Sequence, residues 1–244
     1  MGRAFEFRKG RKMKRWDRMS KDFTRIGREI VMAVKESGPN PDTNSRLRAA
    51  MQNAKGVNMP KDRVEAAIKR ASSKEEKDYQ EVVYEGYAPH GIAIVVETAT
   101  DNPVRTVANV RMYFNRGNGA LGTAGSSDFT FTRKGVFKLA AEGLDRDELE
   151  LELIDFGAED IYEDQEEDEH GTVKELIVVE TAFTDFGHMQ KALEERHLNV
   201  VGAQLQRIPN TTVTLEGDEL EEVMNLIEKF EEDDDVQAVY HTLG

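Results

Sequence analysis

The chain contains no cysteine. This absence excludes disulfide bonds, thiolate metal sites and cysteine nucleophiles, and it suits a reducing compartment such as the cytosol. No apolar run approaches the roughly 20 residues that a membrane-spanning helix needs. The basic N-terminus is also not followed by the apolar stretch of a secretory signal. We therefore expect a cytoplasmic protein with no membrane partner.

The residue patterns typical of catalysis are also absent. The five histidines form no His-Glu-x-x-His pair, no Gly-x-Ser-x-Gly elbow is present, and the glycine-rich stretch 117–126 lacks the Gly-Lys-Ser/Thr ending of a P-loop. The acidic stretch Glu163–Gly171 supplies carboxylates, but not with the spacing of a calcium loop. We predict a protein that is not an enzyme and uses no metal or cofactor.

Charge is abundant, and its two signs are separated along the chain. The formal net charge is −14, yet residues 1–78 hold 21 Lys and Arg against 11 Asp and Glu, a balance of +10. The rest of the chain holds 12 basic and 36 acidic residues, a balance of −24. The basic residues are densest in residues 2–28, which we call the basic arm. A cationic arm on an anionic body predicts a polyanionic partner.

Residues 17–72 show the apolar periodicity of helices. The first helix carries five apolar residues at helical spacing: Met19, Phe23, Ile26, Ile30 and Val34. Ser37-Gly38-Pro39 ends that helix, and a second helix is expected after Asp42. Pro60 suits the first turn of a third helix. The sequence therefore predicts a small helical bundle with basic outer faces.

From residue 79 onward, short apolar runs indicate strands. Strands are expected at 82–84 and 92–98, followed by a helix at 103–116 capped by Asp101 or Asn102. Residues 136–207 then follow the β-α-β-β-α-β order of a ferredoxin-like domain, with strands at 136–140, 160–165, 175–181 and 200–207 and helices at 145–156 and 184–196. The last segment supplies a strand at 212–215, a helix at 218–230 and a strand at 236–242, too little to form a domain alone.

The simplest topology returns that last segment to the sheet begun at Val82. The predicted fold class is therefore a multi-domain α and α+β protein, with an N-terminal helical bundle followed by two α+β domains. The predicted domains are the basic arm and bundle at 1–78, a discontinuous α+β domain at 79–133 plus 211–244, and a ferredoxin-like domain at 134–210 inserted into it.

Several short motifs follow one another along nearly the whole chain. They include Asn44-Ser45-Arg46-Leu47-Arg48, Asn58-Met59-Pro60-Lys61-Asp62, Ala67-Ile68-Lys69-Arg70, Tyr84-Glu85-Gly86-Tyr87-Ala88-Pro89-His90-Gly91, Asp101-Asn102, Arg105-Thr106, Val110-Arg111, Gly119, Leu121-Gly122, Gly125-Ser126 and Lys134-Gly135. Together they resemble the YebC/PmpR family of transcriptional regulators. The resemblance implies three domains, the third inserted in the second, and DNA binding for bacterial members. Related mitochondrial proteins are translational activators, so the resemblance leaves open a ribosome-associated role with rRNA or tRNA as the ligand.

Lys and Arg bind phosphates whatever the base sequence. We therefore predict a DNA-binding transcriptional regulator, or alternatively an RNA-associated translation factor, with a protein partner for the acidic domains. The candidate phosphate contacts are Arg3, Arg8, Lys9, Arg11, Lys12, Lys14, Arg15, Lys21, Arg25, Arg28, Arg46, Arg48, Lys55, Lys61, Lys69, Arg70, Arg105 and Arg111.

Two further features are open to more than one interpretation. Phe5, Phe7 or Trp16 could stack on unpaired bases, although Trp16 is more typical of a packing residue. The glycine-rich loop 117–126 is either a cradle for phosphate or a plain turn between a helix and a strand.

Overall fold

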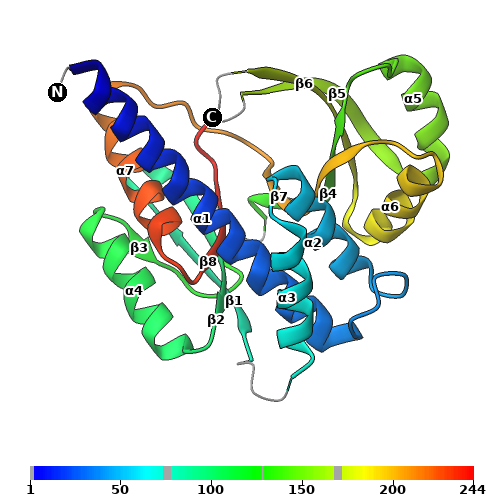
Figure 1. Ribbon diagram of the computed structural model, residues 1–244. Helices are drawn as coiled ribbons and strands as arrows, with labels where there is room; N and C mark the ends of the chain where they lie inside the picture. The colour runs from blue at the N-terminus through cyan, green and yellow to red at the C-terminus, as the bar shows by residue number, and fades with distance from the viewer. Residues whose placement is uncertain (1–2, 74–77, 128, 168–171) are drawn as a thin grey trace. The chain divides into compact units, whose positions relative to one another are not determined.

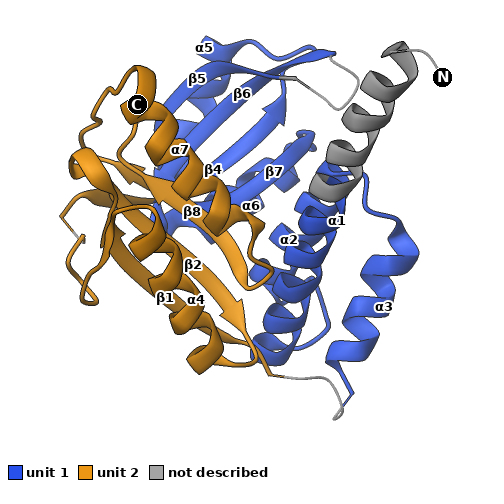
Figure 2. Cartoon of the chain, turned by 90° about the vertical axis from the view of Figure 1, so that its left-hand side faces the viewer, with its two compact units in different colours: residues 1–76, 134–206 blue, residues 77–133, 207–244 orange. Residues whose placement is uncertain are grey.

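The computed structural model describes residues 3–73, 78–127, 129–167 and 172–244, with the side chains of 3–18 and 167 excepted. The chain divides into two compact units (Figure 2). Unit 1 comprises residues 1–76 and 134–206, and unit 2 comprises residues 77–133 and 207–244. Helices lead in the first part of the chain, and two four-stranded sheets follow, so the predicted α and α+β fold class is confirmed.

The helical region of unit 1 consists of α1 (Arg3–Ser37), α2 (Ser45–Gly56) and α3 (Lys61–Ala71), and α2 and α3 both contact α1 (Figure 1). Asn44, not Asp42, caps α2, because its side-chain oxygen accepts a hydrogen bond from the amide of Leu47 at 2.9 Å. The Asn44 amide nitrogen also donates to the carbonyls of Ala33 at 2.7 Å and Gly38 at 2.9 Å. One buried side chain therefore ends the first helix and starts the second.

The remainder of unit 1 has the ferredoxin-like order. Its elements are β4 (Phe131–Ala140), α5 (Arg146–Leu153), β5 (Ala158–Glu167), β6 (Val173–Ala182), α6 (Phe186–Glu195) and β7 (Val200–Pro209), with short 3-10 turns η2 (Ile154–Phe156) and η3 (Phe183–Asp185). The strands lie in the order β5-β6-β4-β7, as the split βαβ arrangement requires. Helices α5 and α6 pack Leu153 and Leu193 against Phe137 and Val179 of the sheet.

Helix α2 is joined to the edge strand β7 of the same unit. The Asn53 side chain donates to the carbonyl of Ala203 at 2.9 Å and accepts from its amide at 2.8 Å. It thus forms with β7 the pair of hydrogen bonds that a residue of a neighbouring strand would form. Ala49 of α2 belongs to the core cluster of this sheet. At Gly56, a Cβ atom would overlap the carbonyl oxygen of Val201. The contact of α2 with β7 therefore requires the side-chain amide of Asn53 and a glycine at position 56.

Unit 2 is built on the strands β1 (Gln80–Tyr87), β2 (Ala93–Thr100), β3 (Ala120–Leu121) and β8 (Val236–His241) in the order β3-β1-β2-β8. A short 3-10 turn, η1 (Pro89–Gly91), joins β1 to β2. Helices α4 (Pro103–Arg116) and α7 (Gly217–Glu232) cover one face of this sheet (Figure 2). Phe114 of α4 and Phe230 of α7 meet in that core with ring centroids 4.8 Å apart.

Three details differ from the sequence prediction. Helix α1 begins at Arg3, so most of the basic arm belongs to the first helix and does not precede it. Ala120 and Leu121, inside the glycine-rich loop, form the short strand β3 beside β1. The strand expected at 212–215 is wrong, because only an isolated bridge between Val213 and Leu243 forms there. The division into three domains stays a prediction.

Candidate nucleic-acid interface

The basic arm lies on α1. The side chains of seven predicted contacts fall outside the described residues: Arg3, Arg8, Lys9, Arg11, Lys12, Lys14 and Arg15. The same holds for the candidate stacking residues Phe5, Phe7 and Trp16. Farther along the helix, Lys21, Arg25 and Arg28 are partly buried, and both arginines interact with neighbouring groups. The roles of all these residues in binding stay predictions.

Arg46 holds α2 against α1. Its guanidinium forms two contacts with the Glu29 carboxylate, Nε to Oε1 at 2.7 Å and NH2 to Oε2 at 3.3 Å. A third contact joins NH1 to Glu36 at 2.9 Å. Two carboxylates on α1 thus neutralise this arginine in fork-like geometry, which gives it a structural role.

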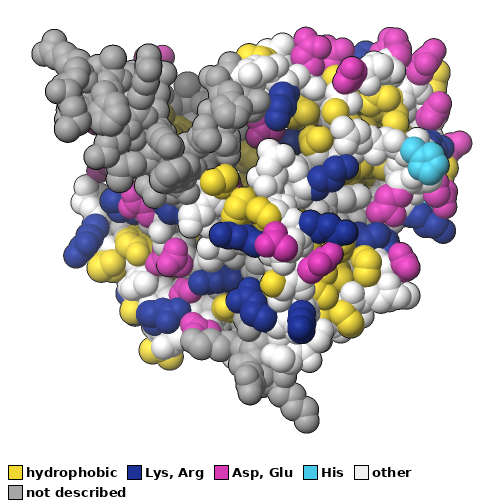
Figure 3. Space-filling view, viewed as in Figure 1, with side chains coloured by type: hydrophobic (Ala, Val, Ile, Leu, Met, Phe, Trp, Pro, Cys, Tyr) yellow, Lys and Arg dark blue, Asp and Glu magenta, His cyan; other side chains and the backbone are white. Residues whose placement is uncertain are grey.

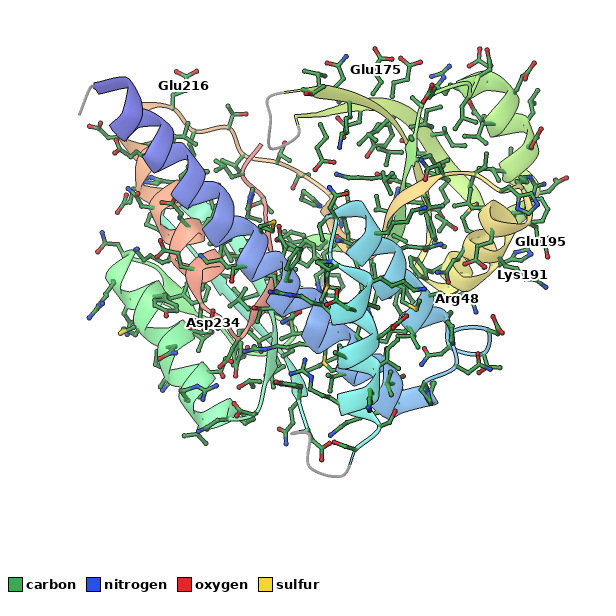
Figure 4. All side chains as sticks on the ribbon, viewed as in Figure 1. Arg48, Glu175, Lys191, Glu195, Glu216 and Asp234 are labelled. Carbon is green, nitrogen blue, oxygen red and sulfur yellow. The ribbon has the colours of Figure 1, made fainter. Side chains whose placement is uncertain are left out.

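Arg48 has a comparable role on the other side of α2. Its NH1 donates to the carbonyls of Pro41 at 2.6 Å and Asp42 at 3.0 Å, and its Nε lies 3.2 Å from the Glu194 carboxylate of α6. Figure 4 labels Arg48 together with Lys191 and Glu195 of α6. Arg48 therefore fixes the loop before α2 and approaches α6, and little of its charge is left for a ligand.

The predicted contacts at the end of α2 and on α3 are exposed cations. Lys55, Lys69 and Arg70 are exposed, and none of them pairs with an acidic side chain within the described part of the chain. Lys61 is 90% exposed and has only a loose contact of 3.5 Å with Glu65. Figure 3 shows Lys and Arg side chains spread over the face that includes α2 and α3, with acidic side chains between them.

Arg63 joins this group, although the sequence prediction did not count it among the contacts. It is exposed on α3 seven residues before Arg70, so the two lie on one face of the helix two turns apart. Its guanidinium lies 5.5 Å from the ring centroid of Phe23 on α1. The spacing of seven residues was the signal in the sequence that would have paired Arg63 with Arg70.

The two candidates on α4 have different surroundings. Arg105 contacts Asp101 at 2.9 Å and the buried Asp235 at 2.7 Å, and hydrogen bonds to these carboxylates raise the pKa of its guanidinium. Burial by itself would raise the pKa of Asp235, but hydrogen bonds from Arg105 and Thr106 bring it below its ordinary value. Arg111 is exposed and pairs with no acidic side chain in the described residues. Of these two arginines, Arg111 is therefore the one whose charge is available to a ligand.

The glycine-rich loop is filled by an anion of the protein itself. The Glu85 carboxylate accepts hydrogen bonds from the amides of Gly125 at 2.9 Å and Ser127 at 2.7 Å, and from the Ser127 hydroxyl at 2.6 Å. Burial alone would raise the Glu85 pKa, but these hydrogen bonds and the nearby Arg207 lower it. Because a carboxylate already takes the donors that a phosphate would need, this part of the loop is not free to cradle one.

Other kinds of site find little support. No group of three or more His, Asp or Glu in the described residues could hold a metal ion. The acidic tip at 163–171 lies in part outside those residues. Within the described ranges, no helix is both long and apolar enough to cross a membrane.

Comparison with known proteins covers nearly the whole chain. The family model described as the TACO1/YebC protein N-terminal domain matches residues 3–74, and the model described as the TACO1/YebC second and third domain matches residues 79–243. A probable transcriptional regulatory protein of Cytophaga hutchinsonii is 62% identical over 244 residues, 100% of this chain and 99% of that one. Another from Myxococcus xanthus is 54% identical over 100% of both chains. The crystal structure of a conserved hypothetical protein from Aquifex aeolicus superposes with a TM-score of 0.77 at 35% identity, over 92% of this chain and 90% of that one.

Proposed function

The chain belongs to the TACO1/YebC family, and we propose from that membership and from its charge distribution that it is a DNA-binding transcriptional regulator. The observation that carries the proposal is the separation of charge, +10 in residues 1–78 against −24 in the rest. Relatives over the full length are named probable transcriptional regulatory proteins, which supports the same assignment.

In this proposal, phosphate contacts come from the basic arm, from the end of α2 and from α3. Among the described side chains outside the arm we assign them to Lys55, Lys61, Arg63, Lys69 and Arg70, which are exposed. Helix α2 is fixed to β7 through Asn53, whereas α3 leaves most of its side chains exposed. Helix α3 is accordingly the helix we propose to face the nucleic acid.

Arg46, Arg48 and Arg105 are left out of the proposed contact set. Each is held by carboxylates of its own unit: Arg46 by Glu29, Arg48 by Glu194 and Arg105 by Asp235. A phosphate would have to compete with these pairs and would gain less than at an unpaired cation. Arg111 remains a separate candidate on α4.

The acidic residues have a complementary role in this proposal. Helix α7 and its ends are rich in carboxylates, among them Glu216 and Asp234, which Figure 4 labels. Like charges repel a nucleic acid, so the carboxylates of α7 disfavour binding at that helix and leave it to segments with exposed cations. The same carboxylates would suit a protein partner with a basic surface.

A second candidate function is an RNA-associated translation factor. It would use the same contacts, because Lys and Arg side chains bind the phosphates of DNA and RNA alike. The described part of the chain has no cysteines for a zinc finger and no basic helix that continues into a leucine zipper. It therefore shows neither of these DNA-binding motifs.

Crosslinking in cells followed by sequencing of both bound DNA and bound RNA tests the assignment. We expect DNA fragments to be enriched over an untagged control, with enrichment near promoters. A matched strain should carry K69A/R70A, for which we expect reduced recovery, and a second should carry K191A as a control change of a lysine on α6. Recovery of ribosomal or transfer RNA without DNA would contradict the proposal and support the translation factor.

A further inference from the structure

Phe129 is the most exposed large hydrophobic residue of the described chain, with 94% of its surface accessible. The residues two positions away on each side are buried, Ser127 with 2% and Phe131 with 6% of their surface accessible. A covered aromatic side chain buries roughly 150–250 Å² and contributes strongly to a core or an interface. Packing within unit 2 therefore does not account for a phenylalanine at this position.

Hydrogen bonds hold the chain at Thr130 and at the carbonyl of Phe129. The Thr130 amide donates to the Ser127 carbonyl at 2.8 Å. The Asn210 side chain donates to the Phe129 carbonyl at 2.9 Å, and the Asn210 amide donates to the Thr130 carbonyl at 2.9 Å. Before the turn, the buried Glu85 carboxylate holds the amide and hydroxyl of Ser127. Because these hydrogen bonds already form in the folded chain, a ligand that covers the ring loses little free energy in ordering Phe129.

Exposed polar residues lie in the loop or are bonded to it: Thr123, Ser126, Thr132 and Asn210. The Tyr87 hydroxyl also donates to the Ser126 carbonyl at 3.2 Å. Anchors in protein interfaces sit in well-packed apolar pockets ringed by other contacts, and an isolated ring in a polar rim does not match that pattern. A nucleobase needs only one aromatic face, with polar groups near its edges.

A basic side chain on the adjoining strand fits the same ligand. Arg133, an exposed cation, follows on β4 within four residues of Phe129. Resting on the nucleic-acid binding proposed above, we infer that Phe129 stacks on an unpaired base of DNA or RNA.

Fluorescence anisotropy with labelled probes tests this inference on the full chain. The probes are a single strand of about 12 nucleotides as DNA, the same sequence as RNA, and the corresponding DNA duplex. We expect Phe129→Ala to weaken single-strand binding about tenfold, since stacking on an aromatic ring contributes about 1–3 kcal/mol per base. Binding to the duplex, whose bases are paired, should not change. The single-stranded probe, DNA or RNA, that loses more affinity on Phe129→Ala is the preferred source of the stacked base.

Two further variants separate stacking from apolar contact. Phe129→Tyr keeps an aromatic face and should bind like the wild type, whereas Phe129→Leu keeps apolar volume and should bind like Phe129→Ala. Thermal unfolding of all three should match the wild type, because the ring is exposed. The inference is overturned if Phe129→Ala leaves single-strand binding unchanged, or if Phe129→Leu restores it. Failure of the proposed function would look different, since the wild-type chain would then bind none of the three probes at low salt.

Discussion

Two buried carboxylates organise unit 2 at the scale of single residues. Glu85 holds the loop that leads to Phe129, and Asp235 accepts hydrogen bonds from Arg105 at 2.7 Å, Thr106 at 2.8 Å and Thr100 at 3.1 Å. A buried carboxylate stabilises a fold only when donors replace the water it has lost. Both residues meet that condition. Their donors lie far away in the sequence, so both carboxylates also connect distant segments of unit 2.

Glu85 makes stability depend on pH. Its pKa in the folded protein is lowered, so the ionised form stabilises the fold above the ordinary pKa of about 4.3, and this contribution is lost as pH falls through the lower folded value. We expect Glu85→Gln to reduce the free energy of unfolding by about 1–2 kcal/mol at pH 7. The difference from the wild type should shrink as pH falls below about 4.3 and through the lowered pKa of Glu85 in the folded protein.

Thermal unfolding between pH 3 and pH 7 measures this difference. Glu221→Gln is the matched control, because Glu221 is exposed on α7 and its loss should change stability little at any pH. Equal stability of Glu85→Gln and the wild type at pH 7 would show that the Glu85 hydrogen bonds do not hold the loop.

The sequence identified the cations but not their partners. Arg105 and Asp235 are 130 positions apart, and Arg48 and Glu194 belong to helices that only the fold brings together. No spacing rule links such pairs, so paired and unpaired arginines look alike before the fold is known. The first strand of the ferredoxin-like part was expected to begin at Val136, and only the structure shows that β4 starts at Phe131 and leaves the ring of Phe129 before it exposed.

At the scale of elements, most helices and strands could be predicted from apolar periodicity. The helix expected at 103–116 matches α4 at both ends, because Asn102 caps it and Pro103 opens it. The start of α1 was missed because residues 3–18 are dense in charge, and charge gives no apolar stripe, although Lys and Arg favour helix. Strand β3 is two residues long and is defined only by its pairing with β1.

The contact between α2 and β7 gives a prediction at this scale. A methyl group at Gly56 would overlap the carbonyl oxygen of Val201, so α2 would have to move from the strand that Asn53 pairs with. We expect Gly56→Ala to lower the free energy of unfolding by about 1–3 kcal/mol, as overpacking generally does. Chemical denaturation of the purified variant measures the change.

Gly27→Ala is the control for the gain in helix propensity that replacing glycine by alanine brings by itself. Gly27 lies inside α1, and a Cβ atom added there would have open space around it, so alanine should stabilise the chain by about 0.5–1 kcal/mol. A Gly56→Ala variant that is as stable as Gly27→Ala would contradict the close packing of α2 on β7.

At the scale of the whole molecule, charge separation is the property that connects sequence to function. It could be read from the sequence without a fold, since it needs only the positions of Lys, Arg, Asp and Glu. The fold adds which cations are available, because Arg46, Arg48 and Arg105 are paired while Lys69 and Arg70 are exposed. It also shows that α2 belongs to the same compact unit as the ferredoxin-like part.

The central claim is that basic side chains of the arm and of α3 bind nucleic-acid phosphates. The most direct measurement is the affinity of the full chain for duplex DNA between 50 and 200 mM salt, for the wild type, R8Q/K9Q/R11Q/K12Q, K69A/R70A and the control K191A. With about six phosphates neutralised, wild-type affinity should fall roughly a thousandfold over this range. R8Q/K9Q/R11Q/K12Q and K69A/R70A should bind more weakly than the wild type. Their plots of log affinity against log salt concentration should be shallower, by about one in slope for each phosphate that is no longer neutralised. K191A should match the wild type. Wild-type binding that does not vary with salt, or equal weakening by K191A, would contradict the account.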